Sequence, residues 1–323
     1  MMSPLDVIEG EVIKLDRGFP LVRLDDGRQV RCEHATALVT GDQHRAVIGD
    51  RVDVCLHDGH DKATIEGIRP RVRELVRKDP TERALPQVLA ANFDRVIVAQ
   101  PLGEVNMRRL ERELVLAYET GAEVTVVLTK ADLVDDEARL SEVRVQVRAL
   151  MPAGVTAVLI GRSGVGKSSL VNLLLGSDVH KTAAVREGDG KGRHTTVSRE
   201  IIDLPGGGRV VDMPGVRGLG LWDADAGIEA AFADVERIAA SCRFRDCKHE
   251  KEPGCAVRAA VEAGDIAPAR FASYQALRQE TETVKERREQ ARWMQREKPA
   301  SGKRAPKRSA KKAAKKPAGK RAR

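Results

Sequence analysis

From residue 7 to about 75, hydrophobic and polar residues alternate with a period of two. Five such runs, separated by turns rich in Gly and Asp, read "GEVIKL", "FPLVRL", "RQVRCEH", "DRVDVCL" and "KATIEGI". Runs of this kind are typical of short antiparallel strands. We therefore predict an OB-type β-barrel over residues 1–75, a platform often used for single-stranded nucleic acid. Phe19 is the only aromatic residue of this segment, which favours backbone contacts over base stacking.

From Phe93 onward the pattern changes to short apolar runs that alternate with helical segments. The runs in "DRVIVAQ" and "EVTVVLTK" are candidates for buried strands, and between them Leu110, Leu114 and Ala117 share one helical face. Strand, helix, strand indicates a parallel α/β sheet. A further run, "VTAVLIG", leads into a glycine-rich turn, and "RVVDMPG" follows it. We predict one α/β nucleotide-binding domain over residues 76–221.

Beyond Trp222 the periodicity is mainly helical, which predicts an α-helical domain over residues 222–297. Its last segment, "RFASYQALRQETETVKERREQARWMQREK", is highly charged and is expected to be a solvated helix. Residues 298–323 contain 12 Lys or Arg and no acidic residue, whereas the rest of the chain has 44 basic and 48 acidic side chains. Such a tail is expected to be disordered in isolation. It either binds nucleic-acid phosphates or only improves solubility, and both interpretations remain open.

The turn after "VTAVLIG" carries the pattern GxxxxGK[ST] at Gly161, Gly166, Lys167 and Ser168. A strand before it and a helix after it are the context in which such a loop binds phosphate. Backbone N–H groups would converge on phosphate oxygens, Lys167 would span the terminal phosphates and the Ser168 hydroxyl would ligate Mg²⁺. The predicted nucleotide-binding loop further includes Arg162, Ser163, Gly164, Val165 and Ser169.

A second phosphate-site motif, DxxG, spans Asp212 to Gly215 directly after a predicted strand. Asp212 can hold the Mg²⁺ shell, and the Gly215 amide can sense the terminal phosphate. Between the two motifs lies "GKGRHTTVS", which is rich in glycine and hydroxyl groups, as is typical of a switch loop. Either Thr195 or Thr196 is the expected Mg²⁺ ligand there, and the sequence does not distinguish them.

A tetrapeptide that could read a guanine base, "TKAD", spans Thr129 to Asp132. Asp132 would accept hydrogen bonds from two donors that adenine lacks, and Lys130 would lie along the base plane. Asn is usual at the first position, where this chain has Thr129. The tetrapeptide precedes the phosphate loop, the reverse of the ordinary order. Because a doubly wound sheet gathers loops at the carboxyl ends of its strands, a circular permutation would preserve the site.

The permuted order, with "GRSGVGKSSLVN", "GRHTT", "DMPGVRG" and a cysteine cluster, resembles the bacterial ribosome small-subunit-dependent GTPase A family, RsgA or YjeQ, over roughly residues 5–295. The resemblance implies a GTPase that uses Mg²⁺ and binds the small ribosomal subunit and its rRNA late in assembly. The subunit stimulates hydrolysis, and hydrolysis to GDP releases the protein. The family has a hydrophobic residue, here Val216, where Ras-like enzymes have a water-orienting Gln. It also carries a switch histidine, so His194 is a catalytic candidate, with an exposed loop histidine as the alternative.

One departure from this family lies between Asp132 and Gly161. Only 28 residues separate these positions, enough for one helix, "DDEARLSEVRVQVRAL", and the strand "VTAVLIG". The family's additional strand and the "SA"-type loop over the guanine are missing. Weaker or less selective GTP binding is therefore expected, and Thr129 in place of Asn acts in the same region. The stretch "VRVQV" alternates like a strand and could partly substitute.

Four residues near the C-terminus form a possible metal site. Cys242, Cys247, His249 and Cys255 follow the pattern C-x4-C-x-H-x5-C. Three thiolates and one imidazole make a closed tetrahedral site, so we predict one structural Zn²⁺ per chain. The alternative is a group of reduced cysteines near a chance histidine. The other two cysteines, at 32 and 55, lie in predicted barrel strands and are expected to be small core residues.

Hydropathy and the N-terminal sequence favour a cytoplasmic protein. No apolar stretch reaches the roughly 18 residues of a membrane span, and residues 1–6 lack the features of a secretory signal. We expect a monomer with no membrane partner. Two other functions stay open: an RNA-binding protein whose nucleotide domain has become structural, and a hydrolase that kept the phosphate chemistry but lost base selection.

Overall fold

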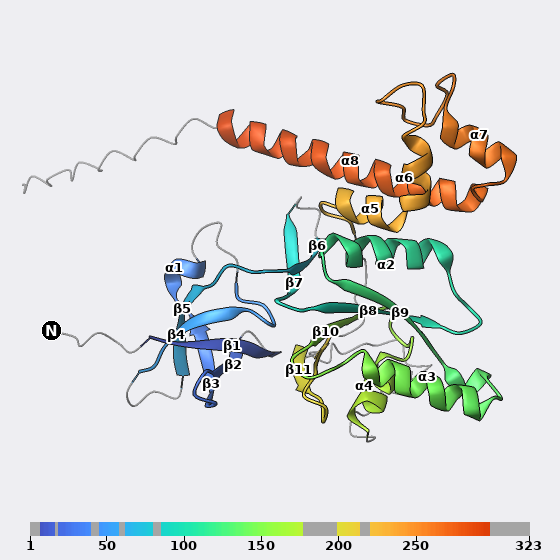
Figure 1. The fold of residues 1–323 in the computed structure, drawn as a ribbon. Coiled ribbons are helices and arrows are strands. Elements are labelled where there is room, and N and C mark those ends of the chain that lie inside the picture. Colours follow the sequence, from blue (N-terminus) through green and yellow to red (C-terminus); the bar gives the residue numbers. More distant parts are fainter. Residues whose placement is uncertain are drawn as a thin grey trace, which may run out of the picture.

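The computed structural model describes residues 7–16, 19–39, 45–57, 62–79, 85–176, 199–213 and 220–297. In Figure 1 the chain begins in a small β-structure, continues through a layered α/β body and ends in a group of helices that crosses above it. The predicted basic tail, 298–323, lies outside the described residues. The boundaries of the predicted domains stay predictions.

The N-terminal segment forms the five predicted strands. They are β1 (Val7–Asp16), β2 (Phe19–Leu24), β3 (Gln29–His34), β4 (Arg51–Cys55) and β5 (Lys62–Ile68), with a short helix α1 (Thr36–Val39). Alternate side chains point inward, as the period of two predicts. Val22, Val52 and Ile65 are fully buried in this core. Cys32 and Cys55 are buried too, which confirms them as core residues.

The middle of the chain forms the predicted parallel α/β sheet, in the order β11-β12-β10-β8-β9. Its strands are β8 (Arg95–Pro101), β9 (Glu123–Thr129), β10 (Thr156–Ile160), β11 (Arg199–Asp203) and β12 (Arg209–Asp212). Its helices are α2 (Met107–Glu119), α3 (Glu137–Ala149), α4 (Lys167–Leu175) and the 3-10 turn Ala131–Leu133. All neighbouring strands from β12 to β9 pair in parallel, whereas β11 pairs antiparallel with β12.

The helices cover the two faces of this sheet unequally. Ala117 of α2 packs on one face with Val96 and Val98, while Val147 of α3 packs on the other with Leu170 of α4. Figure 1 shows α2 on one side of the sheet and α3 with α4 on the opposite side. Crossovers between parallel strands are right-handed, so the outward connection from β8 to β9 and the returning one from β9 to β10 must lie on opposite faces.

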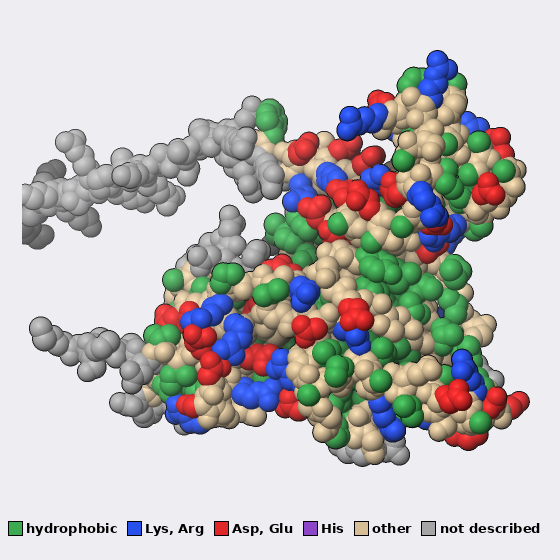
Figure 2. Space-filling view, in the orientation of Figure 1, with side chains coloured by type: hydrophobic (Ala, Val, Ile, Leu, Met, Phe, Trp, Pro, Cys, Tyr) green, Lys and Arg blue, Asp and Glu red, His purple; other side chains and the backbone are tan. Residues whose placement is uncertain are grey.

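One face of β9 is consequently left without a helix. Among the described strands β9 has a single neighbour, β8, and its side chains Val126 and Leu128 are 40% and 50% exposed. Figure 2 shows hydrophobic side chains gathered between α2 and α3. A groove of about 390 Å³ runs between β9 and α3 and reaches Ala131 and Val134 beside the predicted base loop.

The interpretation of "VRVQV" as a strand is wrong, because these residues lie inside α3. The helix begins after Asp136, whose carboxylate accepts a hydrogen bond from the Arg139 backbone N–H. Val143 and Val147, four residues apart, share the face that packs on the core, while Val145 between them is 63% exposed. The apolar spacing of four outweighs the local alternation.

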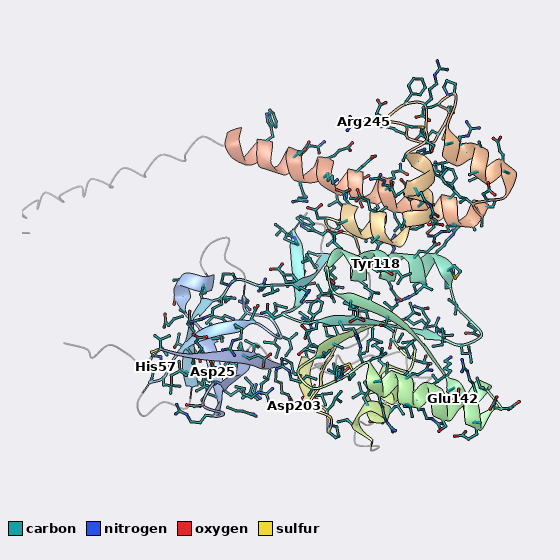
Figure 3. The ribbon with its side chains drawn as sticks, viewed as in Figure 1. Asp25, His57, Tyr118, Glu142, Asp203 and Arg245 are labelled. Atoms are coloured by element: carbon teal, nitrogen blue, oxygen red, sulfur yellow. The ribbon has the colours of Figure 1, made fainter. Side chains whose placement is uncertain are left out.

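The barrel and the α/β sheet form one continuous ten-stranded sheet, which the sequence did not indicate. Strand β1 pairs antiparallel with β11, and the Lys14 ammonium lies 2.6 Å from the Glu200 carboxylate across that junction. Arg23 of the barrel reaches Asp203 at 2.9 Å, and Asp203 is labelled at this border in Figure 3. Because Ile13 belongs to the same core cluster as the strands of the α/β sheet, the two parts share one hydrophobic core.

A second junction between the barrel and the α/β body lies beside a β-hairpin, which the sequence also did not predict. It consists of β6 (Glu74–Lys78) and β7 (Pro86–Ala91). Beside it the fully buried Asp50 carboxylate accepts hydrogen bonds from Arg71 Nε at 2.6 Å and from the Val47 backbone at 2.7 Å. A buried carboxylate is tolerated only when paired in this way, so these contacts fix how the barrel meets the body.

The C-terminal part is helical, as predicted. Its helices are α5 (Asp225–Ala231), α6 (Ala233–Ala239), α7 (Ala256–Ala263) and α8 (Pro268–Glu297). Helix α8 is not the fully solvated helix that its composition suggests, because Tyr274, Leu277 and Val284 are buried along one face. Glu280 of α8 also pairs with Arg112 of α2 at 2.6 Å. Within the described residues, no helix has the length and hydropathy needed to cross a membrane.

Replacing Gly49 with Ala should destabilise the protein through the barrel junction. Gly49 has φ of 84°, and a Cβ there would lie 2.1 Å from the Ala91 carbonyl oxygen. Gly27→Ala is the matched control, since Gly27 has φ of 89° but no atom within 4 Å of the added carbon. We expect urea unfolding to show a loss of about 3 kcal/mol for Gly49→Ala and about 1 kcal/mol for the control. Equal losses would contradict the importance of this contact.

Candidate functional site

The predicted phosphate loop joins the end of β10 to the start of α4. Gly161, Gly164 and Gly166 all have positive φ, of 145°, 74° and 103°. Lys167, the first residue of α4, is only 8% exposed, and its ammonium donates to the carbonyls of Gly161 at 2.8 Å and Arg162 at 3.0 Å. The lysine side chain therefore folds back over the loop that precedes it. It lies at the N-terminus of a helix, a position where anions bind.

Lys167 is buried among charges of both signs. Burial lowers the pKa of this ammonium, while the carboxylates of Asp212 and Glu113 act in the opposite direction. Asp212 ends β12, the strand next to β10, so the DxxG aspartate and the phosphate loop lie at the same edge of the sheet. Ser168 is half-buried in the first turn of α4, and Ser169 beside it is exposed.

The predicted base loop contacts the phosphate loop directly. The Thr129 hydroxyl lies 3.0 Å from the carbonyl oxygen of Gln100 and within hydrogen-bond reach of that of Val165. A Cβ on Gly166 would lie 3.1 Å from Thr129 Cβ, so a residue larger than glycine at position 166 would be pressed against this threonine. The two motifs, reversed in chain order, meet in space as a circular permutation requires.

The remaining residues of the tetrapeptide follow immediately. Lys130 has a left-handed backbone with φ of 59°, which turns the chain into the 3-10 segment that contains Asp132. The side chains of Lys130 and Asp132 are both exposed. His194, Thr195, Thr196 and Gly215 lie outside the described residues.

Two buried polar residues at this site were not predicted from the sequence. Gln100, 3% exposed, lies next to the last residue of β8, and its side-chain amide donates to the fully buried carboxylate of Glu113 in α2. A polar residue that ends an apolar strand at the carboxyl edge of a parallel sheet is a recognisable signal, so Gln100 could have been found. Glu113 could have been found as well, because it lies three residues after Leu110 and four before Ala117, on the helical face predicted to be buried.

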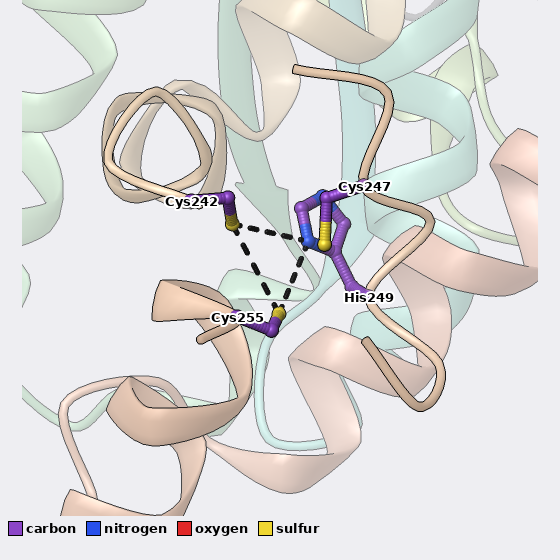
Figure 4. A group of neighbouring side chains, drawn as sticks. All are labelled: Cys242, Cys247, His249 and Cys255. Carbon is purple, nitrogen blue, oxygen red and sulfur yellow. Dashed lines mark hydrogen bonds between the residues drawn. The ribbon is translucent and has the colours of Figure 1, made fainter. Parts of the chain in front are cut away.

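The four predicted metal ligands converge (Figure 4). Their ligand atoms all lie within 4.8 Å of one another. His249 Nδ1 is 3.6 Å from Cys242 Sγ and 3.4 Å from Cys255 Sγ, and the two sulfurs are 4.0 Å apart. Bond lengths of about 2.3 Å to sulfur and 2.0 Å to nitrogen imply tetrahedral edges of about 3.5 to 3.8 Å. The donor set and its size therefore fit one tetrahedral metal ion.

The surroundings hold the ligands in place. His249 is 7% exposed and has a left-handed backbone, with φ of 61°. Burial lowers the pKa of His249, although the carboxylates of Glu236 and Glu252 act the other way, and a lowered pKa favours the neutral imidazole that a metal ion requires. Cys255 is the N-cap of α7, and its sulfur accepts a hydrogen bond from the Arg258 backbone N–H at 3.5 Å.

Comparisons with known proteins agree with this architecture. The family described as RsgA GTPase matches residues 68–155 and 149–222. The two matched stretches meet between α3 and β10, where the sequence lacks the expected strand. Two solved structures share the fold. The circularly permuted GTPase YloQ matches with a TM-score of 0.55 and 22% sequence identity, covering 88% of this chain and 98% of that one. YjeQ from Thermotoga maritima matches with a TM-score of 0.58 and 24% sequence identity, covering 85% of this chain and 98% of that one.

Curated relatives are considerably more similar in sequence. The small ribosomal subunit biogenesis GTPase RsgA of Streptomyces avermitilis is 41% identical over 301 residues, covering 86% of this chain and 80% of the relative. RsgA of Xanthomonas axonopodis is 43% identical over 265 residues, covering 75% and 71%. With this identity over most of both chains, and with the permuted loops meeting in space, the chain belongs to the RsgA family of GTPases.

Proposed function

We propose that this protein is a GTP-hydrolysing factor that binds the small ribosomal subunit and acts late in its assembly. The observation that carries the proposal is the contact of Thr129 with Val165 and Gly166, which joins base loop and phosphate loop into one site. The relatives named above are biogenesis factors of the small subunit, which supports the choice of partner. The monomeric state and the cytoplasmic location stay predictions from the sequence.

The phosphate side of the site supports nucleotide hydrolysis. We infer that the backbone of Gly161 to Ser169 binds the phosphates, that Lys167 neutralises the terminal ones and that Ser168 and Asp212 hold Mg²⁺. The metal ion supplies charge neutralisation during phosphoryl transfer. The fit rests on the buried ammonium of Lys167 and on the carboxylate of Asp212 at the same edge of the sheet, which opposes the lowering of the lysine pKa by burial. Gly215, either Thr195 or Thr196, and the candidate His194 complete the proposed set.

The base loop supports guanine binding, but with less discrimination between guanine and adenine than a closed pocket gives. We infer that Thr129, Lys130 and Asp132 line the base. Asp132 is exposed and the neighbouring groove is open, so water can solvate the carboxylate when the wrong base is bound. The penalty that makes a buried polar group selective is then reduced. This observation favours a second candidate, a hydrolase that accepts both GTP and ATP.

The zinc site and the basic segments support contacts with rRNA. We propose that Zn²⁺ adds to the hydrophobic core that α6 and α7 share with α8, because these two short helices could not build a core alone. The loop that carries the ligands also carries basic side chains, and Arg245 projects at the outer end of the molecule in Figure 3. Together with the barrel and the tail 298–323, this loop offers cations to rRNA phosphates.

Lys167→Ala should abolish GTP hydrolysis and leave binding to small subunits largely unchanged at low salt. The substitution removes the cation of the phosphate loop but none of the proposed rRNA-binding surfaces. Hydrolysis is measured with and without purified subunits, and binding by co-sedimentation. Unimpaired hydrolysis by the variant would remove the phosphate-loop assignment, and a loss of subunit binding would show that Lys167 acts on the fold.

Asp132→Ala should weaken GTP binding by about tenfold and leave ATP binding unchanged, because only guanine donates hydrogen bonds to this carboxylate. The wild-type preference for GTP over ATP should lie at about 10- to 100-fold, which competition binding measures. A preference above about 10⁴-fold, the range of closed polar sites, would contradict the open base pocket.

Elemental analysis should find one zinc per chain, and Cys255→Ser should lose nearly all of it. The variant should also unfold at a lower temperature, since α7 begins at this ligand. Cys32→Ala is the control, because it removes a buried thiol of the barrel and should leave the zinc content at one. Retention of zinc by Cys255→Ser would contradict the ligand set.

A further inference from the structure

Phe244 is an exposed aromatic ring on a hydrogen-bonded turn. It lies in the ligand loop, residues 242–255, which carries the four predicted metal ligands. The Phe244 carbonyl accepts the Cys247 backbone N–H at 3.3 Å, and the Arg243 backbone N–H donates to the Gly254 carbonyl at 3.1 Å. Backbone hydrogen bonds therefore fix the turn on both sides of the ring, yet the ring itself is 41% exposed. The loop thus presents an apolar ring to solvent in a defined place.

The same loop carries cations without a carboxylate partner. Its four basic side chains are exposed, and within the described part of the chain none of them forms an ion pair: Arg243, Arg245, Lys248 and Lys251. The Arg243 guanidinium lies 5.6 Å from the centroid of the Phe244 ring, within the reach of a cation–π contact. Figure 2 shows Lys and Arg side chains at this outer end of the molecule, where Figure 3 labels Arg245.

The carboxylates of the ligand loop leave these cations available. Glu252 is engaged by its own backbone, because its side chain accepts the N–H groups of Lys248 at 3.0 Å, Glu250 at 2.9 Å and Lys251 at 3.0 Å. Four exposed cations then stand against two exposed carboxylates, those of Asp246 and Glu250. This surface is suited to an anionic partner.

Phe244 is not part of an apolar patch. In the described C-terminal part, residues 220–297, the other large hydrophobic side chain that is exposed is Trp293, near the end of α8. Figure 1 shows that end of α8 far from the ligand loop, which lies between α6 and α7. A protein interface places such rings in a hydrophobic centre, whereas single-stranded nucleic acid is bound by aromatic rings set among cations. The surroundings of Phe244 therefore favour RNA over a protein partner.

We propose that Phe244 stacks on an unpaired base of the rRNA and that the cations of the ligand loop bind the phosphates beside that base. The inference rests on the proposed function, in which this loop contacts rRNA, and it adds the kind of RNA that is bound. A base inside a duplex has no free face for a side chain, so the partner is a loop, a bulge or a strand end. Since every base has a π-face, the contact selects unpaired nucleotides without reading their sequence.

The test measures the binding of the full-length protein to fluorescent single-stranded RNA, to duplex RNA of the same length and to purified small subunits. Phe244→Ala should weaken binding to single-stranded RNA and to subunits by about 5- to 100-fold, the value of one base stack, with an unchanged dependence on salt. Duplex binding should change less than about twofold, because a duplex offers no free base. Phe244→Trp keeps a stacking surface and should retain the affinity.

The matched control is Tyr118→Ala, which removes a ring of α2 that is 37% exposed and should change none of the three affinities. Phe244→Leu separates the two classes of partner, because leucine fills an apolar pocket but cannot stack on a base as an aromatic ring does. We expect Phe244→Leu to lose affinity as Phe244→Ala does. Its retention of subunit binding would indicate a protein contact and overturn the proposal.

Unchanged binding of single-stranded RNA by Phe244→Ala also overturns the proposal, and so does an equal loss for duplex RNA. Zinc content is measured for every variant, so that a disrupted ligand loop is recognised. Should Phe244→Ala lose zinc, the comparison of Phe244→Leu with Phe244→Trp provides the same readout. Failure of the proposed function is distinguishable, because the wild-type protein would then not bind small subunits, whereas the measurements with RNA alone do not depend on them.

Discussion

The parallel pairing of β8 with both β9 and β10 is the constraint on which the site depends. It places three strand ends side by side: Gln100 in the centre, Thr129 on one flank and Gly161 on the other. The base loop and the phosphate loop follow the two flanking strands and contact each other above the end of the central strand. Since this meeting depends on strand pairing alone, the order of the motifs along the chain has no effect on it.

The same pairing determines which part of β9 the shortened connection leaves uncovered. The chain returns from β9 to β10 directly, so right-handed crossing places α3 beside α4 and leaves Val126 and Leu128 uncovered. Phosphate binding uses the backbone of one loop and the start of one helix, which this change does not touch. The groove that Val126 and Leu128 line reaches Ala131 and Val134 beside the predicted base loop.

The barrel and the C-terminal helices contact this sheet through strand pairing and side-chain packing, in addition to the covalent connection. The barrel continues the sheet through β1 and β11, and β11 in turn pairs with β12, which ends in Asp212. On the other side, α2 buries Ala117 against the sheet and Leu116 against the C-terminal helices. Packed and hydrogen-bonded elements therefore connect both the barrel and the C-terminal helices to the edge of the sheet that carries the predicted nucleotide site.

The sequence by itself determined the elements and the motif chemistry, because these depend on local spacing: the five barrel strands, the glycine loop before Lys167 and the cysteine and histidine ligands. Its alternation misled at "VRVQV", where packing on the core at a spacing of four residues outweighed it. Only the tertiary structure decided which polar side chains point inward. The Asp50 carboxylate looks like a surface group in the sequence, and its burial is tolerated because it pairs with Arg71, 21 positions away. Glu113 lies on the predicted apolar face of its helix, but its partner Gln100 comes from a strand that local spacing does not place beside it. The joining of barrel and body into one sheet likewise rests on pairing between residues such as Lys14 and Glu200, 186 positions apart.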